Sequence, residues 1–521
     1  MGKYIGIDLG TTYSAAAYID GSGNPQIIPN SDGGRTTPSA VLFEDGNAIV
    51  GEDAKKESIT SPDHFVAFAK RSMGNNSQKW HIGNEDYRPE TISAIVLKKI
   101  KEDCETALGD TIDGAVITVP AYFTDLQRTA TKDAARIAGI NVLSIINEPT
   151  AAALAYGLSK GSAERKRILV FDLGGGTFDV SIMEFREDNI EILSSMGDSM
   201  LGGYDFDKEI VNWFIDQAKL QGIDVNEDTD ALQNLWISAE DAKKALSSGK
   251  SKTKITIYVM GKKVSAELLK EEFESMIEPY LTGAMGFVDA SLDEADLEYE
   301  NIDRILLVGG STRIPKVKET IEEWTGITPS QDINPDEAVA IGAAYYVLEC
   351  AKRQDNQDTL PSSGTQTTAK NDLPEIDKTF TFTDRTSHGI GIEAVNDYSE
   401  IINSVIIPKN TVLPAEATNV YQTVADYQTE LELIVRQGED EDIRATTEIG
   451  KTILKLQPKP KGYPIEVTIS CDIDAIIHVR VFDVEDGLDL GEMKIERTAN
   501  MSQPEMEKAQ LRVGKLNIGG M

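Results

Sequence analysis

Residues 4–12 read YIGIDLGTT, and residues 168–177 read ILVFDLGGGT. Each stretch is an apolar run of strand length that ends in Asp-Leu-Gly and small residues. A second apolar run follows, at 14–19 and at 178–183. This pattern predicts two β-hairpins with tight, glycine-bearing loops. The chain therefore uses one design twice.

The two hairpin loops have the composition of a phosphate clamp. Glycine lets backbone N–H groups approach a ligand without an intervening Cβ, and successive N–H groups form an anion nest. The threonine hydroxyls add donors, and Asp8 and Asp172 could hold a hydrated cation between them. Two ordinary hairpin turns are the alternative, but the repeated flanks favour the clamp.

Composition excludes several classes of protein. The 521 residues favour two to four domains, and 40% hydrophobic with 26% charged residues is typical of a globular protein. A net charge of −35 argues against nucleic acid and anionic membranes as partners. The three cysteines, Cys104, Cys350 and Cys471, form no disulfide framework or zinc spacing. With no leader and no bilayer-spanning run, we expect a cytoplasmic location.

Strands alternate with helices through the first half, which predicts a parallel or mixed sheet with ligand loops at the strand ends. The expected strands are Ala40–Phe43, Ala115–Val119 and Val142–Ile146. Helices are expected over Phe65–Arg71, over Gln127–Ala138 after an N-cap at Thr124, and from an N-cap at Thr150 to Gly157.

In the second half, a helix is expected over Phe206–Lys219 and another over Asp230–Ser248, the latter with two distinct faces. One face is apolar and contains Leu232, Leu235, Trp236, Ala239, Ala242 and Leu246. The other carries Glu240, Lys243, Lys244 and Ser247, for which a solvated surface is the usual explanation. A third strand-to-glycine loop follows at 305–313, and a helix is expected near Ala338–Ala351.

Composition changes near residue 354, where a polar linker is expected over 354–378 after a first region of 1–353. The region 379–498 then alternates short β-forming runs with turn signals, which predicts an all-β sandwich. Those runs are 401–407, 419–424, 430–435, 465–469 and 476–482. In the tail, 499–521, Ser502 and Glu505 form a capping box for one short helix, which Gly514 would end.

Five ordered motifs resemble the DnaK-type chaperones of the seventy-kilodalton heat-shock family, over residues 1 to about 498. They are 6–12 (GIDLGTT), 119–123 (VPAYF), 145–153 (IINEPTAAA), 172–179 (DLGGGTFD) and 308–313 (VGGSTR). The short connection between Gly74 and Thr91 is similar to the bacterial HscC-like subgroup. The resemblance implies an α/β actin-like ATPase with two lobes, each built on one hairpin, followed by the β-sandwich.

The resemblance also implies roles for individual residues around ATP or ADP, Mg²⁺ and a second candidate cation, K⁺. Asp8 and Asp172 would hold Mg²⁺ through water, Lys70 would reach the γ-phosphate, and Glu148 would lie near the attacking water, with Thr177 completing the catalytic set. The phosphate loops would be Gly10, Thr11, Thr12 and Tyr13 with Gly174, Gly175, Gly176 and Thr177. The remaining pocket residues would be Gly202, Gly203, Glu240, Lys243, Lys244, Ser247, Gly309, Gly310, Ser311, Arg313 and Asp336.

In the β domain the resemblance rests on 388–393, 409–411 and 436–439. It implies that unfolded or extended polypeptide binds at Ile392, Val395, Tyr421, Val424, Leu431 and Leu433. A place in the sandwich core is the alternative for Ile392 and Leu433. Residues 378–384 align with a linker strand that docks on the ATPase, with Phe380 and Phe382 as its two apolar anchors.

Several positions depart from the family pattern. The trimmed first lobe weakens the case for an exchange factor, whereas a J-domain co-chaperone is the implied partner. Ser144 stands where many members carry a basic residue, and Tyr204 replaces an acidic one. The tail is too short for a helical lid, so a lid is expected to be absent. The rival functions are a nucleotide-holding scaffold without turnover and a metabolite kinase on the same fold.

Overall fold

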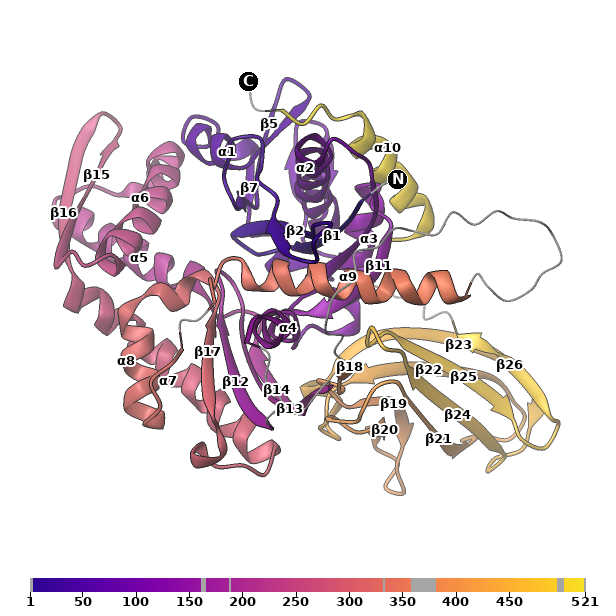
Figure 1. The fold of residues 1–521 in the computed structure, drawn as a ribbon. Helices are drawn as coiled ribbons and strands as arrows, with labels where there is room; N and C mark the ends of the chain where they lie inside the picture. Colours follow the sequence, from indigo (N-terminus) through magenta and orange to yellow (C-terminus); the bar gives the residue numbers. More distant parts are fainter. Residues whose placement is uncertain are drawn as a thin grey trace.

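The computed structural model describes residues 3–160, 165–186, 189–330, 333–357, 381–493 and 501–519. Two sheets, one in each lobe of the first region, are built on the two predicted hairpins (Figure 1). The strand order is β11-β10-β1-β2-β3 in the first sheet, where β4 also pairs with β2. It is β17-β12-β13-β14-β18 in the second. Because β10 runs parallel to β1 just as β17 runs parallel to β12, the duplication is confirmed.

The bounds of these strands follow the predicted apolar runs. The first sheet contains β1 (Lys3–Asp8), β2 (Tyr13–Ile19), β3 (Pro25–Ile27), β4 (Thr37–Pro38), β10 (Ile112–Val119) and β11 (Val142–Asn147). The second contains β12 (Lys166–Leu173), β13 (Phe178–Arg186), β14 (Asn189–Asp198), β17 (Arg304–Val308) and β18 (Thr381–Thr383). Asp8 and Asp172 therefore stand at equivalent places, at or next to the end of the first strand of each hairpin.

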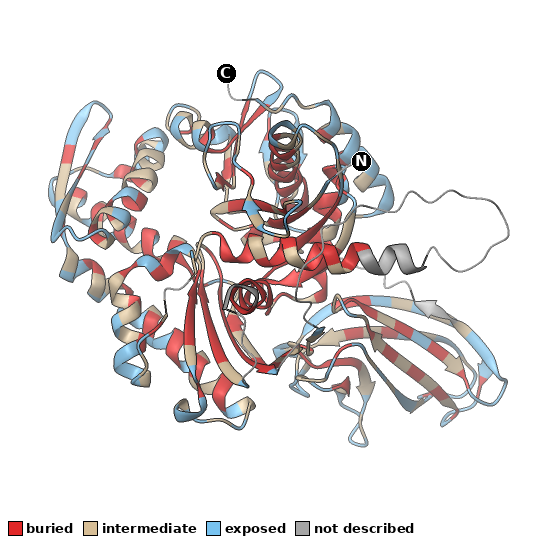
Figure 2. Ribbon diagram, viewed as in Figure 1, coloured by how far each residue is buried: buried red, intermediate tan, exposed pale blue. Residues whose placement is uncertain are grey.

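Two helices, α4 (Glu148–Lys160) and α9 (Ala338–Gln357), lie between the two sheets and share a buried core with both. Small residues permit the close contact. A Cβ on Gly6 of β1 would stand 2.1 Å from the backbone nitrogen of Ala344, and one on Gly342 would stand 1.7 Å from the Ala151 carbonyl oxygen. The buried strands and α4 form the central red band in Figure 2.

The other elements cover the outer faces of the lobes. Their helices are α1 (Glu52–Glu57), α2 (Pro89–Leu108), α3 (Asp125–Ile137), α5 (Gly203–Leu220), α6 (Thr229–Ser247), α7 (Lys270–Glu294) and α8 (Pro315–Thr325). Their strands are β5 (Ala40–Glu44), β6 (Asn47–Val50), β7 (Phe65–Ala67), β8 (Trp80–Ile82), β9 (Glu85–Tyr87), β15 (Lys252–Val259) and β16 (Lys262–Leu269). None of the helices in the described ranges is long and apolar enough to cross a bilayer.

The helix expected over Phe65–Arg71 is wrong. Phe65–Ala67 form strand β7, because Val66 pairs with Val41 of β5. Phe68 then has a φ of +59°, which ends the strand, and a single 3₁₀ turn, η2 (Ala69–Ser72), follows. This turn presents Lys70 to the interior.

The start and end expected for the next helix also differ from the structure. The helix α4 begins at Glu148, so Thr150 lies inside its first turn and is not the N-cap. Pro149 suits this early start, because a proline in the first turn lacks only an N–H that has no helical partner. The helix also continues past Gly157 to Lys160, and α9 runs to Gln357, into the range predicted as linker.

The region after β18 is a sandwich of two antiparallel four-stranded sheets around its own core. One sheet has the order β20-β19-β22-β23, and the other has β21-β24-β25-β26. The first is built from β19 (Ile390–Val395), β20 (Ile401–Ile407), β22 (Gln428–Gln437) and β23 (Thr447–Lys459). The second is built from β21 (Ala415–Gln422), β24 (Pro464–Cys471), β25 (Ile477–Asp483) and β26 (Leu488–Met493).

The tail helix α10 (Gln503–Lys515) packs on the first lobe, beside α2 and α3, and away from the sandwich (Figure 1). Ala509 and Val513 are buried in the core of that lobe. Gly514 does not end the helix. The carbonyl oxygens at the C-terminal end of α10 accept hydrogen bonds from Lys98 of α2. Its Nζ lies 3.0 Å from the Val513 oxygen and 2.7 Å from the Leu516 oxygen.

Candidate functional site

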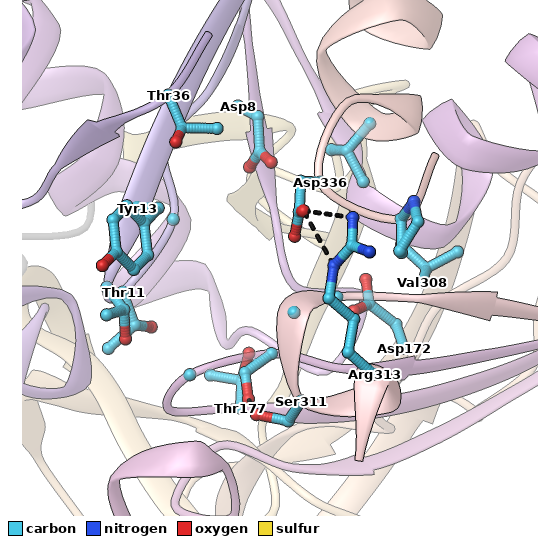
Figure 3. Close-up of a pocket in the computed structure, with 18 of the residues that line it drawn as sticks. Asp8, Thr11, Tyr13, Thr36, Asp172, Thr177, Val308, Ser311, Arg313 and Asp336 are labelled. Carbon is cyan, nitrogen blue, oxygen red and sulfur yellow. Dashed lines mark hydrogen bonds and ion pairs between the residues drawn. The ribbon is translucent and has the colours of Figure 1, made fainter. Parts of the chain in front are cut away.

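A cavity of about 620 Å³ lies between the two lobes, where the hairpin loops face each other (Figure 3). Most of the predicted nucleotide residues line it: Asp8, Gly10, Thr11, Thr12, Tyr13, Lys70, Glu148, Asp172, Gly174, Gly175, Thr177, Glu240, Lys243, Lys244, Ser247, Gly309, Gly310, Ser311, Arg313 and Asp336. The lining also contains Ser14, Thr36, Ser248, Val308, Ile314, Pro335 and Val339, which were not among the predicted site residues.

The two predicted phosphate loops, 10–13 and 174–177, are called the first and second phosphate-type loops below. They contact each other across the cavity. A Cβ on Gly175 would lie 1.9 Å from the Thr12 hydroxyl oxygen, and one on Gly176 would lie 2.5 Å from the Thr11 methyl carbon. Only glycine permits this approach, which leaves the backbone N–H groups of both loops close to the cavity. Gly176, Gly202 and Gly203 lie behind this surface, where Gly203 N–H donates to the Gly174 carbonyl at 3.0 Å.

Lys70 and Glu148 form a buried ion pair at the inner end of the cavity. The Nζ–Oε1 distance is 2.5 Å, and the two residues are 4% and 7% exposed. Lys70 comes from η2 of the first lobe and Glu148 from the start of α4, so two separate elements converge on one point. Phe123 lies beneath the ammonium group, 5.7 Å from ring centroid to Nζ.

Three further carboxyl groups carry raised pKa values beside this pair. Burial, with the charge of Glu148 second, raises the pKa of Asp8 to about 7 and raises that of Asp172 well above its ordinary range. The same two causes raise the pKa of Asp179 to about 7. Carboxyl oxygens are ligands that divalent cations prefer, so a divalent cation with bound phosphate would suit this donor set.

The polar face of α6 borders the cavity, so the solvated-surface explanation of its charges is wrong. Glu240 contacts Lys55 of α1 at 2.5 Å and Lys244 at 2.7 Å. Burial alone would raise the pKa of Glu240, but the two ammonium groups lower it to about 2. The Tyr13 hydroxyl joins this group and accepts from Lys244 at 2.9 Å. Lys55 is a contact that no local motif revealed.

The opposite wall is formed by the third glycine loop. Arg313 lies at the end of the 3₁₀ turn η5 (Gly310–Arg313) and pairs with Asp336, with Nη2 2.5 Å from Oδ2 (Figure 3). The Ser311 hydroxyl donates to the Gly174 carbonyl at 2.8 Å, which ties this loop to the second phosphate-type loop. Ile314, Pro335 and Val339 add apolar surface, so the wall suits a flat, partly apolar group.

The β-sandwich is joined to the two-lobed region through strand β18 and the residue that follows it. Strand β18 adds in parallel to β14, as the linker alignment predicted, and Phe382 packs on Tyr346 of α9 with a centroid distance of 5.6 Å. Phe380 lies outside the described residues. Asp384 accepts from Asn147, the residue before Glu148, at 2.9 Å. Asp384, which directly follows the docked strand, therefore contacts the residue next to the catalytic candidate Glu148.

Additional polar contacts fix the sandwich on the first lobe. Asp474 accepts from the Ser144 hydroxyl at 2.5 Å and pairs with Lys132 at 2.6 Å. Asp125 accepts from the Ile477 N–H at 3.1 Å. His388 contacts the Tyr122 carbonyl through Nε2 at 3.1 Å. Ser144, which departs from the family pattern, thus makes an interdomain hydrogen bond.

The predicted polypeptide-binding residues divide into two groups. Ile392 and Leu433 belong to the sandwich core, which is the alternative that their pattern left open. Val395, the last residue of β19, and Val424, in the turn after β21, are 52% and 57% exposed. Tyr421 and Leu431 are half-buried, so their exposure is intermediate between that of the two groups. The Tyr421 hydroxyl lies 2.9 Å from the Ser404 hydroxyl.

Comparisons with known proteins agree with this geometry. The model of the family described as Hsp70 protein matches residues 4–84 and 75–516. Relatives include the "Chaperone protein DnaK" of Thermotoga petrophila and that of Thermotoga maritima. Each is 42% identical over 494 residues, which cover 93% of this chain and 78% of the relative. The chain belongs to the Hsp70 family of ATP-dependent molecular chaperones, which hydrolyse ATP and bind unfolded polypeptides.

Proposed function

We propose that the interlobe cavity is the ATPase site and that Lys70 and Glu148 act directly on the transferred phosphoryl group and the attacking water. The supporting observation is their buried 2.5 Å ion pair at the point where both phosphate-type loops converge. Phosphoryl transfer has a loose transition state, so positioning and charge neutralisation supply most of the catalysis. Buried groups from two elements meet that need without a covalent nucleophile.

Asp8 and Asp172 would hold Mg²⁺ through water molecules, because both carboxyl groups line the cavity beside the predicted phosphate loops. Bound Mg²⁺ supplies charge neutralisation at the phosphate oxygens. Lys70 donates to a γ-phosphate oxygen, and Glu148 orients the attacking water and accepts its proton. Thr177, 5% exposed beside the second phosphate-type loop, adds a hydroxyl donor. The α6 face, with Glu240 and Lys244, would hold the ribose and base.

The polypeptide site is proposed around the end of β19, which carries Val395, and the turn after β21, which carries Val424. An extended segment there would gain backbone hydrogen bonds and bury an aliphatic side chain, which contributes about 1.5–3 kcal/mol. Tyr421 and Leu431 would form the walls, with Ile392 and Leu433 beneath them. In the described residues α10 packs on the first lobe and does not cover this site, which supports a lidless mode of binding with fast release.

Two further proposals concern the partner and the location of the protein. A J-domain co-chaperone would suit the docked surface around Lys132 and Ser144, because this surface connects both domains. We place the protein in the cytoplasm, where the free, buried cysteines Cys104, Cys350 and Cys471 would stay reduced. The family assignment removes the metabolite kinase alternative.

Replacing Lys70 with alanine tests the catalytic assignment. ATP binding should persist, because many other groups hold the nucleotide, whereas single-turnover hydrolysis should fall by about 10²–10³-fold, the effect of losing one preorganised charge. Lys56→Ala is the matched control, since the Lys56 side chain is 66% exposed outside the cavity. A Lys70→Ala protein that hydrolyses bound ATP at the parent rate would remove the assignment.

A further inference from the structure

A cluster of aromatic side chains joins the two lobes beside the nucleotide cavity. Phe68 comes from the first lobe, and Tyr204 and Trp236 come from α5 and α6 of the second. The Phe68 and Tyr204 ring centroids are 4.8 Å apart, with the ring planes at 61°. Tyr204 stacks on Trp236 at 5.1 Å and 11°. Both arrangements are favourable for aromatic pairs.

Arg71 extends the same contact. Its guanidinium carbon lies 4.7 Å from the centroid of the Tyr204 ring, a favourable cation–π arrangement. It also donates to Asp205 Oδ1, at 3.3 Å and 3.2 Å from its two terminal nitrogens, and to the Met200 carbonyl. Phe68 and Arg71 flank Lys70, so the turn that carries Lys70 is held to the second lobe on both sides.

Tyr204 connects this turn to the second phosphate-type loop. Its backbone N–H donates to the Gly175 carbonyl at 2.7 Å, while its ring contacts Phe68 and Arg71. Phe68 has a φ of +59°, a conformation that is uncommon for a bulky side chain and persists only where surrounding contacts enforce it. The contacts of the cluster therefore hold strained backbone next to Lys70.

We propose that Phe68, Arg71, Tyr204 and Trp236 form an interlobe clasp that must separate before nucleotide leaves, with Tyr204 as its positioning residue. The nucleotide residues come from both lobes, so release requires the lobes to part. Every contact across the cleft that breaks during parting adds to the barrier. Trp236 is one turn of α6 from Glu240, so the clasp lies next to the Lys55–Glu240 contact and acts on the same opening.

The test is the dissociation rate of a fluorescent ADP analogue from the full chain, measured by stopped-flow with excess unlabelled ADP. Tyr204→Ala and Phe68→Ala should each raise the rate by about 5–10-fold, from the loss of an aromatic pair. Since both remove the same contact, the double variant should release ADP little faster than the faster single variant. Tyr204→Phe, which keeps the ring, should stay within about twofold of the parent.

Control variants distinguish the loss of the clasp contacts from a general destabilisation of the fold. Tyr258→Ala removes a 62% exposed ring from β15 of the same lobe and should leave the rate unchanged. Phe68→Asn removes the ring but suits a positive φ, so it should speed release without lowering the unfolding temperature. Parental rates in the Tyr204→Ala and Phe68→Asn variants, or fully multiplicative effects in the double variant, would overturn the clasp.

The inference rests on the cavity being the nucleotide site, and the same experiment distinguishes the two claims. A parent protein that fails to bind the ADP analogue contradicts the proposed site itself. A parent that binds it, with variants that release it at the parental rate, contradicts only the clasp. Because ADP release involves no bond cleavage, the result is independent of the role proposed for Lys70.

Discussion

Phe382 anchors the strand that docks the sandwich on the ATPase region, and Phe382→Asp should release it. The ring is half-buried against the core around α4 and α9 and packs edge-on against Tyr346, with the ring planes at 89°. Within the described residues β18 pairs with β14 through three residues, so these backbone hydrogen bonds alone give weak docking. A carboxylate at this position would also lose the apolar contact and require hydration.

The expected magnitude follows from the contacts. Half-burial of a phenylalanine contributes about 1–1.5 kcal/mol, and the aromatic pair adds about 0.5–1.5 kcal/mol. The sum, about 1.5–3 kcal/mol, corresponds to a roughly 12–150-fold shift toward the undocked state. Phe382→Leu is the matched control, because it keeps most of the apolar burial and loses mainly the aromatic pair.

Docking can be followed by energy transfer between dyes on cysteines introduced at the exposed positions Lys219 and Lys461. Selective labelling is feasible because Cys104, Cys350 and Cys471 are buried, and burial raises the pKa of Cys104 and of Cys471 to about 12. Phe382→Asp should lower energy transfer in ATP and abolish stimulation of hydrolysis by polypeptide. Unchanged transfer and stimulation in this variant would refute the docking argument.

Two further predictions concern the tail and pH. Deleting residues 501–521 uncovers the lobe around Ala509 and Val513, so the unfolding temperature measured by calorimetry should fall by several degrees; an unchanged value would show that the tail is dispensable. Burial lowers the pKa of His388 despite its contact with the Tyr122 carbonyl, so docking is favoured above the ordinary histidine pKa of about 6.5 and should weaken as pH falls below it. The charged groups that act on this histidine are Glu439, Lys409 and Arg128. His388→Gln should remove the pH dependence of energy transfer, and a persistent dependence would exclude His388 as its source.

Most of the residues predicted for the nucleotide line one cavity, because the predicted phosphate loops are short, local backbone motifs. The loops after Asp8 and Asp172 needed only adjacent glycines and threonines in a hairpin, and the structure places them as expected. The paired charges on α6 were harder to interpret. Their helical spacing fits a solvated surface equally well, and only the family resemblance assigned them to the cavity.

The remaining features depend on contacts between distant segments. Lys55 of α1 and Glu240 of α6 are brought together by the fold, and no spacing in the sequence reveals that pair. The segment 65–71 looks helical by composition, but pairing with β5 and the left-handed Phe68 override local preference. The clasp around Tyr204 was visible only as a departure from the family pattern. The role proposed for Tyr204 rests on its contacts with Phe68, Arg71 and Trp236.

The most direct test of the account is phosphate release from ATP by the full chain, with and without a reduced, unfolded polypeptide. The account couples ATP hydrolysis at Lys70 and Glu148 to a polypeptide site in the docked sandwich. The protein should therefore hydrolyse ATP slowly by itself and faster when polypeptide is added. A Val395→Asp, Val424→Asp double variant should keep the basal rate and lose the stimulation. Stimulation that survives in this variant, or a parental rate that polypeptide leaves unchanged, would contradict the account.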